Sequence, residues 1–521
     1  MTRSAAEIGA GLAAVRPPRA IVRGERIHVV GIAGAGASAA ALLASAAGAE
    51  VSGCDAGGAS PYTPAIRSTG IAFATTHDPA HVLDAPRPDR LAVSKALTAV
   101  APDHPELTAA RETGIPCEPW QQLIADAATG RRLVAVAGTH GKSTSAGWLT
   151  HVLAEAGADP SAFVGALLPG SLTGGPPATA RVGAGAAFVV EADEYAGNFD
   201  AYRPSVIVLT SAEWDHPDVF ADRAAVLAAF EAWIRAAAPG ATLVANVSDP
   251  GVAEIASRLG AWLGTMLAVG IVEAAPQRIG GYARGIAERF RTAAGPAETV
   301  LGRIGETPSA GTVVEIHGLD ALHGPNSVQL PTVGRHNVAN ALGVAGAALV
   351  LGTPANAIAS GLASFPGIGR RLERKGEAAG VTVYDDYGHH PTAIRETILA
   401  LRQREPGRPI RAFYEPLTFH RTAALLGDFA AALATADEVV VADIWAGRDL
   451  DTANVSPADL ARAVARLRPG HEPATPGSVE ATAAWLAGHV TPGEVVLVMG
   501  GGRSYRIGEL LLEHLASVAS A

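Results

Sequence analysis

The sequence predicts an α/β protein made of three domains with mainly parallel sheets. Its 521 residues are too many for a single hydrophobic core. Along the whole chain, short apolar runs of strand length alternate with helix-like segments, which is the pattern of βαβ units. Aromatic residues make up only 5% of the chain while 59 residues are glycine, and this composition favours helices packed closely on sheets.

The composition limits the classes of function. The formal net charge of −10 argues against a general nucleic-acid-binding protein, which needs a basic face. The only cysteines, Cys54 and Cys117, are typical of a reducing compartment and exclude both a disulfide framework and a cysteine-rich zinc site. No stretch approaches 18 uncharged apolar residues, and residues 1–24 form an N-terminal extension without the apolar core of a signal peptide. We therefore expect a cytoplasmic protein with no membrane insertion and no nucleic-acid partner.

The first block, residues 25–129, opens with "RIHVVGIAGAGASAAALLASAAGAEVSGCD", which reads as strand, glycine turn, helix and strand. Further strand-like runs follow at 90–94 and 114–119. The turn fits the dinucleotide fingerprint, whose glycines let the backbone approach a pyrophosphate and whose later acid binds a ribose hydroxyl. The candidate residues for this site are Gly34, Ala35, Gly36, Ser38 and Asp55. The alternative is a turn that only packs a helix on a strand, and the motif does not separate NAD from another diphosphate such as a UDP-sugar.

The second block, residues 130–364, opens with a stronger motif. "GTHGKST" at 138–144 lies between an apolar run and a helix-like segment, so its backbone N–H groups can surround phosphate oxygens. Lys142 would neutralise the phosphates, and the Ser143 hydroxyl would bind Mg²⁺. Val136 stands where the usual phosphate loop has a further glycine, so the match is to a shorter form of the motif. The candidate phosphate-binding residues are Gly138, Thr139, His140, Gly141, Lys142, Ser143 and Thr144.

Acidic residues follow two later strand-like runs of this block. "FVVEADE" (188–194) supplies Glu191, Asp193 and Glu194 where an apolar run ends, and "SAEWDHPD" (211–218) supplies Glu213, Asp215 and His216. Strand ends are the usual place for the metal-facing acids of phosphate-loop folds, although a solvated acidic loop is the alternative. Another strand is expected at 241–249. The glycine-rich stretch 265–332 contains short β-like runs and reads as an insertion, and a helix follows "GRHNVANAL".

The third block, residues 365–521, repeats the pattern of a strand followed by polar residues. "VYDDYGHHP" places Asp385, Asp386, Tyr387, His389 and His390 at one strand end, and "YEPLTFHRT" (414–422) follows the next strand. Packing alone does not explain such a density of polar residues. The preceding pair Arg370–Arg371 is either a solvated charge pair or reaches across to phosphates.

The ordered motifs "GIAGAGAS", "AVAGTHGKST", "EADE", "EWDH", "GRHNVANAL", "GRRLE", "DDYGHHPT" and "GGGRSYRIG" resemble those of the Mur ligase family over nearly all of residues 26–515. These are ATP-dependent enzymes that form amide bonds in peptidoglycan precursor synthesis. The resemblance implies a Rossmann-like UDP-binding domain (25–129), a central ATP-binding domain (130–364) and a C-terminal Rossmann-like ligase domain (365–521). ATP would phosphorylate a carboxylate, and an amino group would then attack the acyl phosphate.

The resemblance also implies roles for individual residues. Lys142 would hold the γ-phosphate, while Ser143, Glu191 and His216 would bind Mg²⁺. Asn337 and Asn340 would lie near the adenine, and Arg371 and Asp385 would complete the ATP site when the third domain closes. His140 would contact both ATP and the UDP substrate. The catalytic group would comprise Lys142, Glu191, His216, His389 and Arg421.

Within the family, the motifs are most similar to the branch that joins L-alanine to the carboxylate of UDP-N-acetylmuramate. The alternatives are the branch that returns a murein tripeptide to the same nucleotide, a non-catalytic nucleotide-binding relative, and an NAD-dependent dehydrogenase. Thr418 departs from the alanine-joining pattern, which has an arginine there, whereas Arg421 is kept. Arg421 would therefore hold the amino acid's carboxylate alone. We expect a monomer or a homodimer.

The chain has three lysines, at positions 95, 142 and 375. Several Mur ligases use a carbamylated lysine in the central domain to support a second metal. Since no lysine lies between 143 and 374, this chain lacks that device. The absence favours the branches that work without it.

Overall fold

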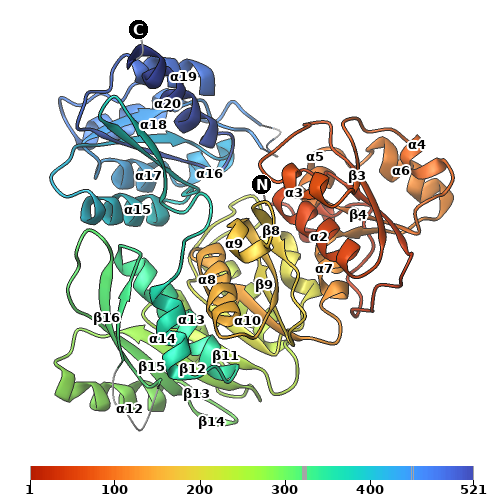
Figure 1. Ribbon diagram of the computed structural model, residues 1–521, viewed down its shortest axis with the longest axis horizontal. Helices are drawn as coiled ribbons and strands as arrows, with labels where there is room; N and C mark the ends of the chain where they lie inside the picture. The colour runs from red at the N-terminus through yellow and green to blue at the C-terminus, as the bar shows by residue number, and fades with distance from the viewer. Residues whose placement is uncertain (1, 320–325, 448, 450, 520–521) are drawn as a thin grey trace.

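The computed structural model describes residues 2–319, 326–447, 449 and 451–519. It contains three α/β domains in chain order, coloured red to orange, yellow to green, and blue in Figure 1. The predicted fold class is confirmed. In Figure 1 the central domain lies between the other two, with the N-terminal domain on its right and the C-terminal domain above it.

The N-terminal domain has a parallel five-stranded sheet in the order β3-β2-β1-β4-β5. Its strands are β1 (Arg26–Val30), β2 (Glu50–Cys54), β3 (Ala72–Ala74), β4 (Arg90–Val93) and β5 (Cys117–Pro119). Its helices are α2 (Ala35–Ala46), α3 (Thr63–Ser68), α4 (Ala80–Leu83), α5 (Lys95–Val100), α6 (Pro105–Thr113) and α7 (Trp120–Ala127). A Cβ atom on Gly36 would lie 2.2 Å from the Trp120 ring, so this glycine lets α2 pack directly on α7.

The N-terminal extension is folded against the first two domains. Its helix α1 (Ala5–Ile8) begins with a capping box between Ser4 and Glu7, and Ile8 is fully buried. Ile8 packs against Ala99 of the first domain and Tyr195 of the second. The extension, which precedes β1 in the chain, therefore contacts both the first and the second domain.

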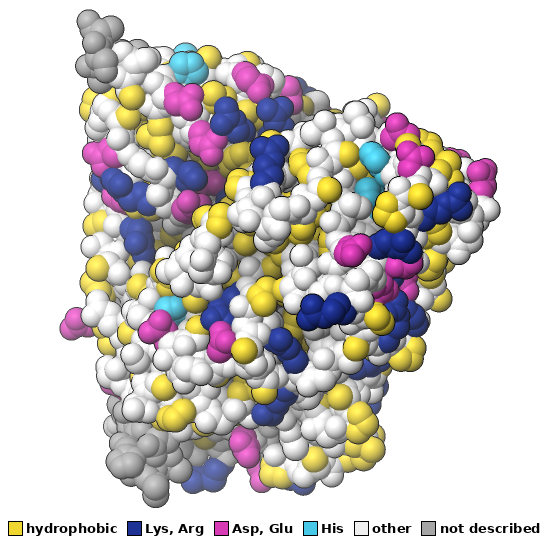
Figure 2. All heavy atoms as spheres, turned by 45° about the vertical axis from the view of Figure 1, so that its right-hand side comes forward, with side chains coloured by type: hydrophobic (Ala, Val, Ile, Leu, Met, Phe, Trp, Pro, Cys, Tyr) yellow, Lys and Arg dark blue, Asp and Glu magenta, His cyan; other side chains and the backbone are white. Residues whose placement is uncertain are grey.

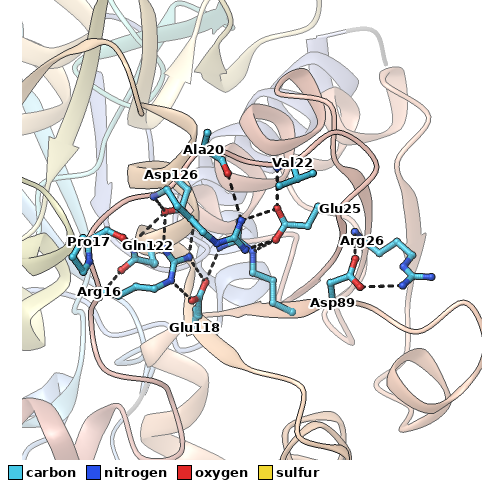
Figure 3. Close-up of polar contacts among 12 residues, drawn as sticks. Arg16, Pro17, Ala20, Val22, Glu25, Arg26, Asp89, Glu118, Gln122 and Asp126 are labelled. Carbon is cyan, nitrogen blue, oxygen red and sulfur yellow. Dashed lines mark hydrogen bonds and ion pairs between the residues drawn. The ribbon is translucent and has the colours of Figure 1, made fainter.

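Two arginines of the extension bind a cluster of buried carboxylates, and the contacts of Arg16 are shown in Figure 3. Arg16 pairs with Glu118 at 2.7 Å and with Asp126 at 2.6 Å, while Arg19 binds Glu25. Arg90 lies beneath them with only 3% of its side chain exposed and contacts Asp126 at 2.5 Å. Charges removed from water need such partners, so the network fixes the path of the extension across the end of the sheet.

The central domain has one ten-stranded sheet in the order β17-β16-β15-β12-β11-β10-β6-β9-β7-β8. Its first strands are β6 (Arg132–Ala137), β7 (Ser161–Leu168), β8 (Ala178–Arg181), β9 (Ala187–Ala192), β10 (Val206–Leu209) and β11 (Thr242–Asn246). Its helices are α8 (Lys142–Glu155), α9 (Gly170–Thr173), α10 (Arg223–Arg235), α11 (Pro250–Arg258), α12 (Ile279–Arg289), α13 (Arg335–Val350) and α14 (Ala355–Ala363), with 3₁₀ helices η1 (Tyr195–Ala201) and η2 (Pro276–Arg278). The core on one face gathers apolar residues of α8, α13 and α14.

The stretch 265–332 is not a separate insertion, which corrects the sequence prediction. Its strands β12 (Thr265–Ile271), β15 (Glu298–Ile304), β16 (Thr312–His317) and β17 (Asn326–Leu330) extend the central sheet, and β13 (Arg291–Thr292) and β14 (Gly295–Pro296) form a small hairpin. Residues 320–325 of this stretch lie outside the described residues. The short β-like runs of this stretch could be recognised in the sequence, but their pairing with the strands of the central domain could not.

The C-terminal domain has a five-stranded sheet in the order β18-β19-β22-β20-β21. Its strands are β18 (Glu373–Ala378), β19 (Val381–Asp386), β20 (Ile410–Glu415), β21 (Glu438–Val441) and β22 (Val495–Gly500). Its helices are α15 (Pro391–Arg404), α16 (Phe419–Ala424), α17 (Leu426–Leu433), α18 (Pro457–Leu467), α19 (Val479–Ala487) and α20 (Tyr505–Ala519).

The sheets are parallel in their centres, but several edge pairs are antiparallel. These are β16 with β15 and β17, β8 with β7, and β18 with β19. Only Ala379 and Gly380 join β18 to β19, and both have positive φ, as a tight hairpin turn requires. A parallel pair needs a crossover of a dozen or more residues, so such short connections force the antiparallel pairing.

Among the described residues, none of the helices is both long enough and apolar enough to cross a membrane. On the face presented in Figure 2, acidic and basic side chains are interspersed among polar and apolar ones. The positive charges on this face are therefore not separated from the negative ones.

Candidate active site

The phosphate loop connects β6 to α8, and its shape depends on two glycines. Gly138 and Gly141 have φ values of 135° and 78°, which favour glycine. A Cβ atom on Gly141 would lie 2.4 Å from Asn340, and one on Gly138 would lie 2.3 Å from the Thr210 hydroxyl oxygen. The loop is thus closely packed against the strand end of β10 and the first turns of α13.

Lys142 is the first residue of α8, and its ammonium group is enclosed by the loop and by acids. Nζ donates to the Gly138 carbonyl at 2.6 Å and pairs with Glu194 at 3.1 Å. Burial opposes the charge, but Glu194 and Asp193 outweigh it and raise the pKa of Lys142 above its ordinary value. Burial also raises the pKa of Glu194 to about 7, and Lys142 offsets only part of this effect. Lys142 is therefore positively charged. The Glu194 carboxyl is close to half-protonated near pH 7, so a bound metal ion would compete with its proton.

The predicted metal ligands form two adjacent groups. The Ser143 hydroxyl donates to Glu191 at 3.0 Å, and the Gly165 amide donates to the same carboxylate at 2.6 Å. His216 lies 3.7 Å from Glu194, and ligand atoms of Asp193, Glu194 and His216 all lie within 4.8 Å of one another. Hydroxyl and carboxylate oxygens are the donors that Mg²⁺ prefers, so the oxygens of these groups fit that ion, whereas the His216 nitrogen is a less usual ligand for it.

Glu194 is the residue that the predicted metal set omitted. The sequence places it in the acidic segment with Glu191, but the structure brings His216 next to Glu194. Glu194 is 2% exposed, whereas Glu191 is half-buried. Its position after the end of β9, where the chain turns into η1, carries it back toward the phosphate loop. The strand pattern alone did not reveal this turn.

His140 of the loop contacts the C-terminal domain through Glu213. The Glu213 carboxylate lies 3.3 Å from His140 Nε2 and accepts from the Thr392 hydroxyl at 2.7 Å. The rings of His140 and His390 are 4.5 Å apart. Although burial opposes ionisation, His140 and Thr392 lower the pKa of Glu213 to about 2. An ionised Glu213 therefore links the second and third domains beside the phosphate loop.

Arg421 enters the same region from α16. Its side chain is 2% exposed, and it pairs with Asp215 at 2.8 Å and with His216 Nδ1 at 3.0 Å. His389 is half-buried, and its Nδ1 lies 2.9 Å from the Tyr387 carbonyl oxygen. Burial, with the Arg421 cation, holds the pKa of His389 well below its ordinary value. His389 is therefore neutral, whereas the positively charged Arg421 side chain contacts His216 directly.

Arg371 reaches the phosphate loop from the third block, as expected. Its Nη2 donates to the Ser143 hydroxyl at 2.8 Å. Asp385 is fully buried and pairs with Arg370 Nε at 3.1 Å. Burial raises the pKa of Asp385 to about 6 despite this arginine. Asp385 lines a cavity of about 740 Å³ together with Arg371 and Asn337, and its role toward ATP stays a prediction. Arg370 also lies over the Tyr387 ring, so the pair Arg370–Arg371 is not a solvated charge pair.

Two cavities collect most of the other predicted residues. A cavity of about 400 Å³ is lined from all three domains by Ala35, Gly36, His140, Lys142, Ser143, Glu191, His216, His389 and Arg421. A second, of about 470 Å³, is lined by His140, Gly141, Thr144, Asn337 and Asn340. His140 lines both cavities, and its contact with both ATP and the UDP substrate stays a prediction. The phosphate loop thus forms the wall between them.

Ser38 and Asp55 have structural contacts that the sequence did not predict. Ser38 is 1% exposed, and its hydroxyl bonds the Ala35 carbonyl and lies 3.0 Å from the Thr179 hydroxyl of β8. This side chain lies in the contact between the first and second domains. Its predicted contact with the UDP substrate stays a prediction. Asp55 accepts from the amides of Ala33 and Gly57, which holds the glycine turn in shape.

Three family models match the chain in order. The Mur ligase family catalytic domain matches residues 26–132, and the Mur ligase middle domain matches residues 136–348. The third model, the glutamate ligase domain of Mur ligases, matches residues 370–502. The three matches correspond to the three sheets of the structure.

Full-length relatives agree with these matches. The chain is 39% identical over 498 residues to the UDP-N-acetylmuramate–L-alanine ligase of Kineococcus radiotolerans, covering 95% of this chain and 97% of that one. Its fold is similar to the UDP-N-acetylmuramate–alanine ligase of Thermotoga maritima, with a TM-score of 0.72, 22% identity, and 95% and 99% of the chains covered. A murein peptide ligase of Psychrobacter arcticus gives a TM-score of 0.69, 22% identity, and coverage of 95% and 99%. This chain belongs to the Mur ligase family.

Proposed function

We propose that the protein is an ATP-dependent ligase that joins L-alanine to the carboxylate of UDP-N-acetylmuramate in peptidoglycan precursor synthesis. The observation that carries the proposal is the cavity in which the glycine turn, the phosphate loop, the acids and Arg421 meet. The near-full-length relative at 39% identity, which bears the name of that activity, supports the same reaction. The ATP that the reaction consumes suggests that the protein acts in the cytoplasm.

The ATP side of the reaction belongs to the phosphate loop. Loop amides and the Lys142 ammonium would hold the γ-phosphate, and Asn337 and Asn340 would line the nucleoside cavity. Ser143, Glu191, Glu194 and His216 would hold Mg²⁺, which would screen the repulsion between the phosphates and the approaching carboxylate. Arg371 would add a second cation beside Ser143. These charges favour transfer of the γ-phosphoryl group to the muramic acid carboxylate.

The amine side of the reaction belongs to the third domain. Arg421 would hold the carboxylate of the amino acid, and neutral His389 would accept a hydrogen bond from its amino group and orient it for attack. The Tyr387 carbonyl would accept a hydrogen bond from Nδ1–H of His389, which leaves Nε2 as the accepting atom. The tetrahedral intermediate then expels phosphate, and an amide remains.

The test is incubation with ATP, Mg²⁺ and UDP-N-acetylmuramate, with L-alanine or with a murein tripeptide in parallel. We expect phosphate release that requires both the nucleotide and L-alanine, together with an amide product detected by mass spectrometry. Turnover with the tripeptide alone would assign the protein to the recycling branch, which the departure at Thr418 keeps as the second candidate. ATP binding without release of phosphate would identify a non-catalytic relative.

A further inference from the structure

A cluster of histidine, cysteine and glutamate side chains lies inside the N-terminal domain, apart from the active site. Glu106 of α6 is fully buried at its centre. His28 comes from β1, Cys54 from the end of β2 and His81 from α4. Hydrophobic side chains of the same domain surround Cys54. None of these residues has a role in the proposed reaction.

The side chains converge on a small volume. Cys54 Sγ lies 3.0 Å from Glu106 Oε2, and His81 Nδ1 lies 2.6 Å from Glu106 Oε1. His28 Nε2 lies 3.8 Å from Glu106 Oε2, and the ligand atoms of all four residues lie within 4.8 Å of one another. The ligand atoms of a tetrahedral zinc site with bonds of about 2.0–2.3 Å are separated by about 3.3–3.8 Å. The four atoms therefore need only small shifts to surround one ion.

The orientation of His28 points to a cation. The side chain is 3% exposed, and its Nδ1 lies 2.8 Å from the Ser52 hydroxyl oxygen. His28 Nε2 has no hydrogen-bond partner within the described part of the chain. The tautomer in which Nδ1–H donates to Ser52 leaves a lone pair on Nε2 for a cation. A buried nitrogen without a partner is costly in free energy. Metal-binding histidines commonly use their second nitrogen in this way, which fixes the ring and its tautomer.

We propose that His28, Cys54, His81 and Glu106 form a structural Zn²⁺ site. Imidazole nitrogens, a thiolate and a carboxylate are ligands that suit zinc, whereas Mg²⁺ and Ca²⁺ prefer oxygen alone. Four protein ligands leave no open position, so the ion would hold the domain together without reacting with substrate. The single cysteine explains why cysteine counting does not reveal the site.

The site would act on the base of the glycine turn. The Cys54 carbonyl accepts from the amides of Gly31 at 2.8 Å and Ile32 at 3.1 Å, and Asp55 follows Cys54 directly. Zinc bound to the Cys54 thiolate would hold Cys54 in place, and with it the carbonyl that accepts from Gly31 and Ile32. Loss of the metal should therefore loosen the turn while the phosphate loop of the central domain stays intact.

The test uses the full-length protein, zinc analysis and cobalt substitution. A Co²⁺ ion bound to thiolate has an intense sulfur-to-metal charge-transfer absorption, and this chain has only two cysteines. Cys54→Ala removes the proposed ligand. Cys117→Ala is the matched control, because Cys117 is also a buried free cysteine of the same domain. His81→Ala is a second variant in a half-buried position, with less effect on packing than Cys54→Ala.

We expect about one zinc per chain in the purified protein and a thiolate–cobalt absorption after exchange. The absorption should be lost in Cys54→Ala and kept in Cys117→Ala, while His81→Ala should keep it with a cobalt affinity weakened at least tenfold. Absence of the absorption in the parent protein, or its persistence in Cys54→Ala, would overturn the proposal. If Cys54→Ala does not fold, an unchanged cobalt affinity in His81→Ala would overturn it as well. Ligase activity is not needed for any of these readouts.

Discussion

Lys142 is the residue on which transfer of the γ-phosphate depends most. Lys142→Ala should lower phosphate release by roughly a thousandfold, because a lost transition-state cation costs several kcal/mol of barrier. The amine also donates to Gly138, so the loop loses one internal bond. Steady-state kinetics and thermal unfolding should be measured together. Near-normal turnover in a folded variant would remove Lys142 from its proposed role.

Glu191, Glu194 and His216 should determine the Mg²⁺ requirement. Glu191→Ala and His216→Ala should each raise the Mg²⁺ concentration for half-maximal turnover by roughly 10–100-fold. Glu254→Ala, on α11 away from the cavities, is the control. An unchanged magnesium titration in both active-site variants would assign these side chains to structure alone.

Glu194 should also make Mg²⁺ binding depend on pH. Burial raises the pKa of this carboxyl to about 7, so below that pH a cation must displace a proton. The Mg²⁺ requirement should therefore increase as pH falls through about 7 and decrease above it. Glu194→Gln should weaken Mg²⁺ binding and remove most of this dependence. Magnesium titrations of both proteins between pH 6 and 8 would show it, and parallel curves would contradict it.

Arg421 should affect the amino acid more than ATP. A charge-assisted bond contributes about 1.5–3 kcal/mol, so Arg421→Ala should raise the KM for L-alanine by roughly tenfold to a hundredfold per bond. Its contact with His216 adds an effect on Mg²⁺ that the sequence did not predict. A KM change confined to ATP would exclude the assignment. Thr418→Arg is a poor companion test, because Thr418 is buried and has a φ of 64°.

At the scale of elements, the N-terminal extension depends on Asp126 of α7. Asp126→Ala should destabilise the first domain by about 1.5–3 kcal/mol, since Arg90 loses one buried charge-assisted bond but still pairs with Glu118 at 2.7 Å. Asp89→Ala should cost less than about 1 kcal/mol, because the Asp89–Arg26 pair is exposed. Both aspartates appear in Figure 3. Urea unfolding followed by circular dichroism would compare them, and equal losses would contradict the burial argument.

The Asp126 effect should also depend on pH. Burial opposes its ionisation, but hydrogen bonds from Arg16, Arg19 and Arg90 outweigh burial and lower its pKa. A lowered pKa contributes stability that is present above the unfolded pKa of about 3.9 and is lost as pH falls through the folded value. The difference between Asp126→Ala and the parent protein should therefore shrink below about pH 4.

The central strands and their motifs could be predicted from the sequence because they are apolar on both faces. β9, β10 and β22 lie within the predicted runs. Short β-like runs could be predicted in the stretch that forms β16 and β17, but their place at the edge of the central sheet could not, because it depends on which strands they pair with. Glu194 and Asp385 could be placed at strand ends, but their partners depend on side-chain directions that only the packed structure provides. The buried cluster around Glu106 has no linear motif, since its members come from four elements.

At the scale of the molecule, the third domain contributes Arg371 to the phosphate loop, where it contacts Ser143, 228 positions earlier in the chain. Arg371→Ala should raise the KM for ATP by roughly tenfold or more, the value of one charge-assisted bond. Arg462→Ala is the control, because this arginine is exposed on α18 and pairs only at the surface. Kinetics at varied ATP concentration would measure the effect, and equal KM values in the two variants would show that Arg371 does not serve the nucleotide.

The docking of α1 has a consequence for biosynthesis. A ribosome makes Ile8 and Arg3 first, but Ile8 packs on Tyr195 and the Arg3 amide donates to the Asp218 carbonyl. At about 5–20 residues per second, those partners follow roughly 10–40 seconds later. Ile8 and Arg3 must therefore wait for these partners until much of the second domain has left the ribosomal tunnel.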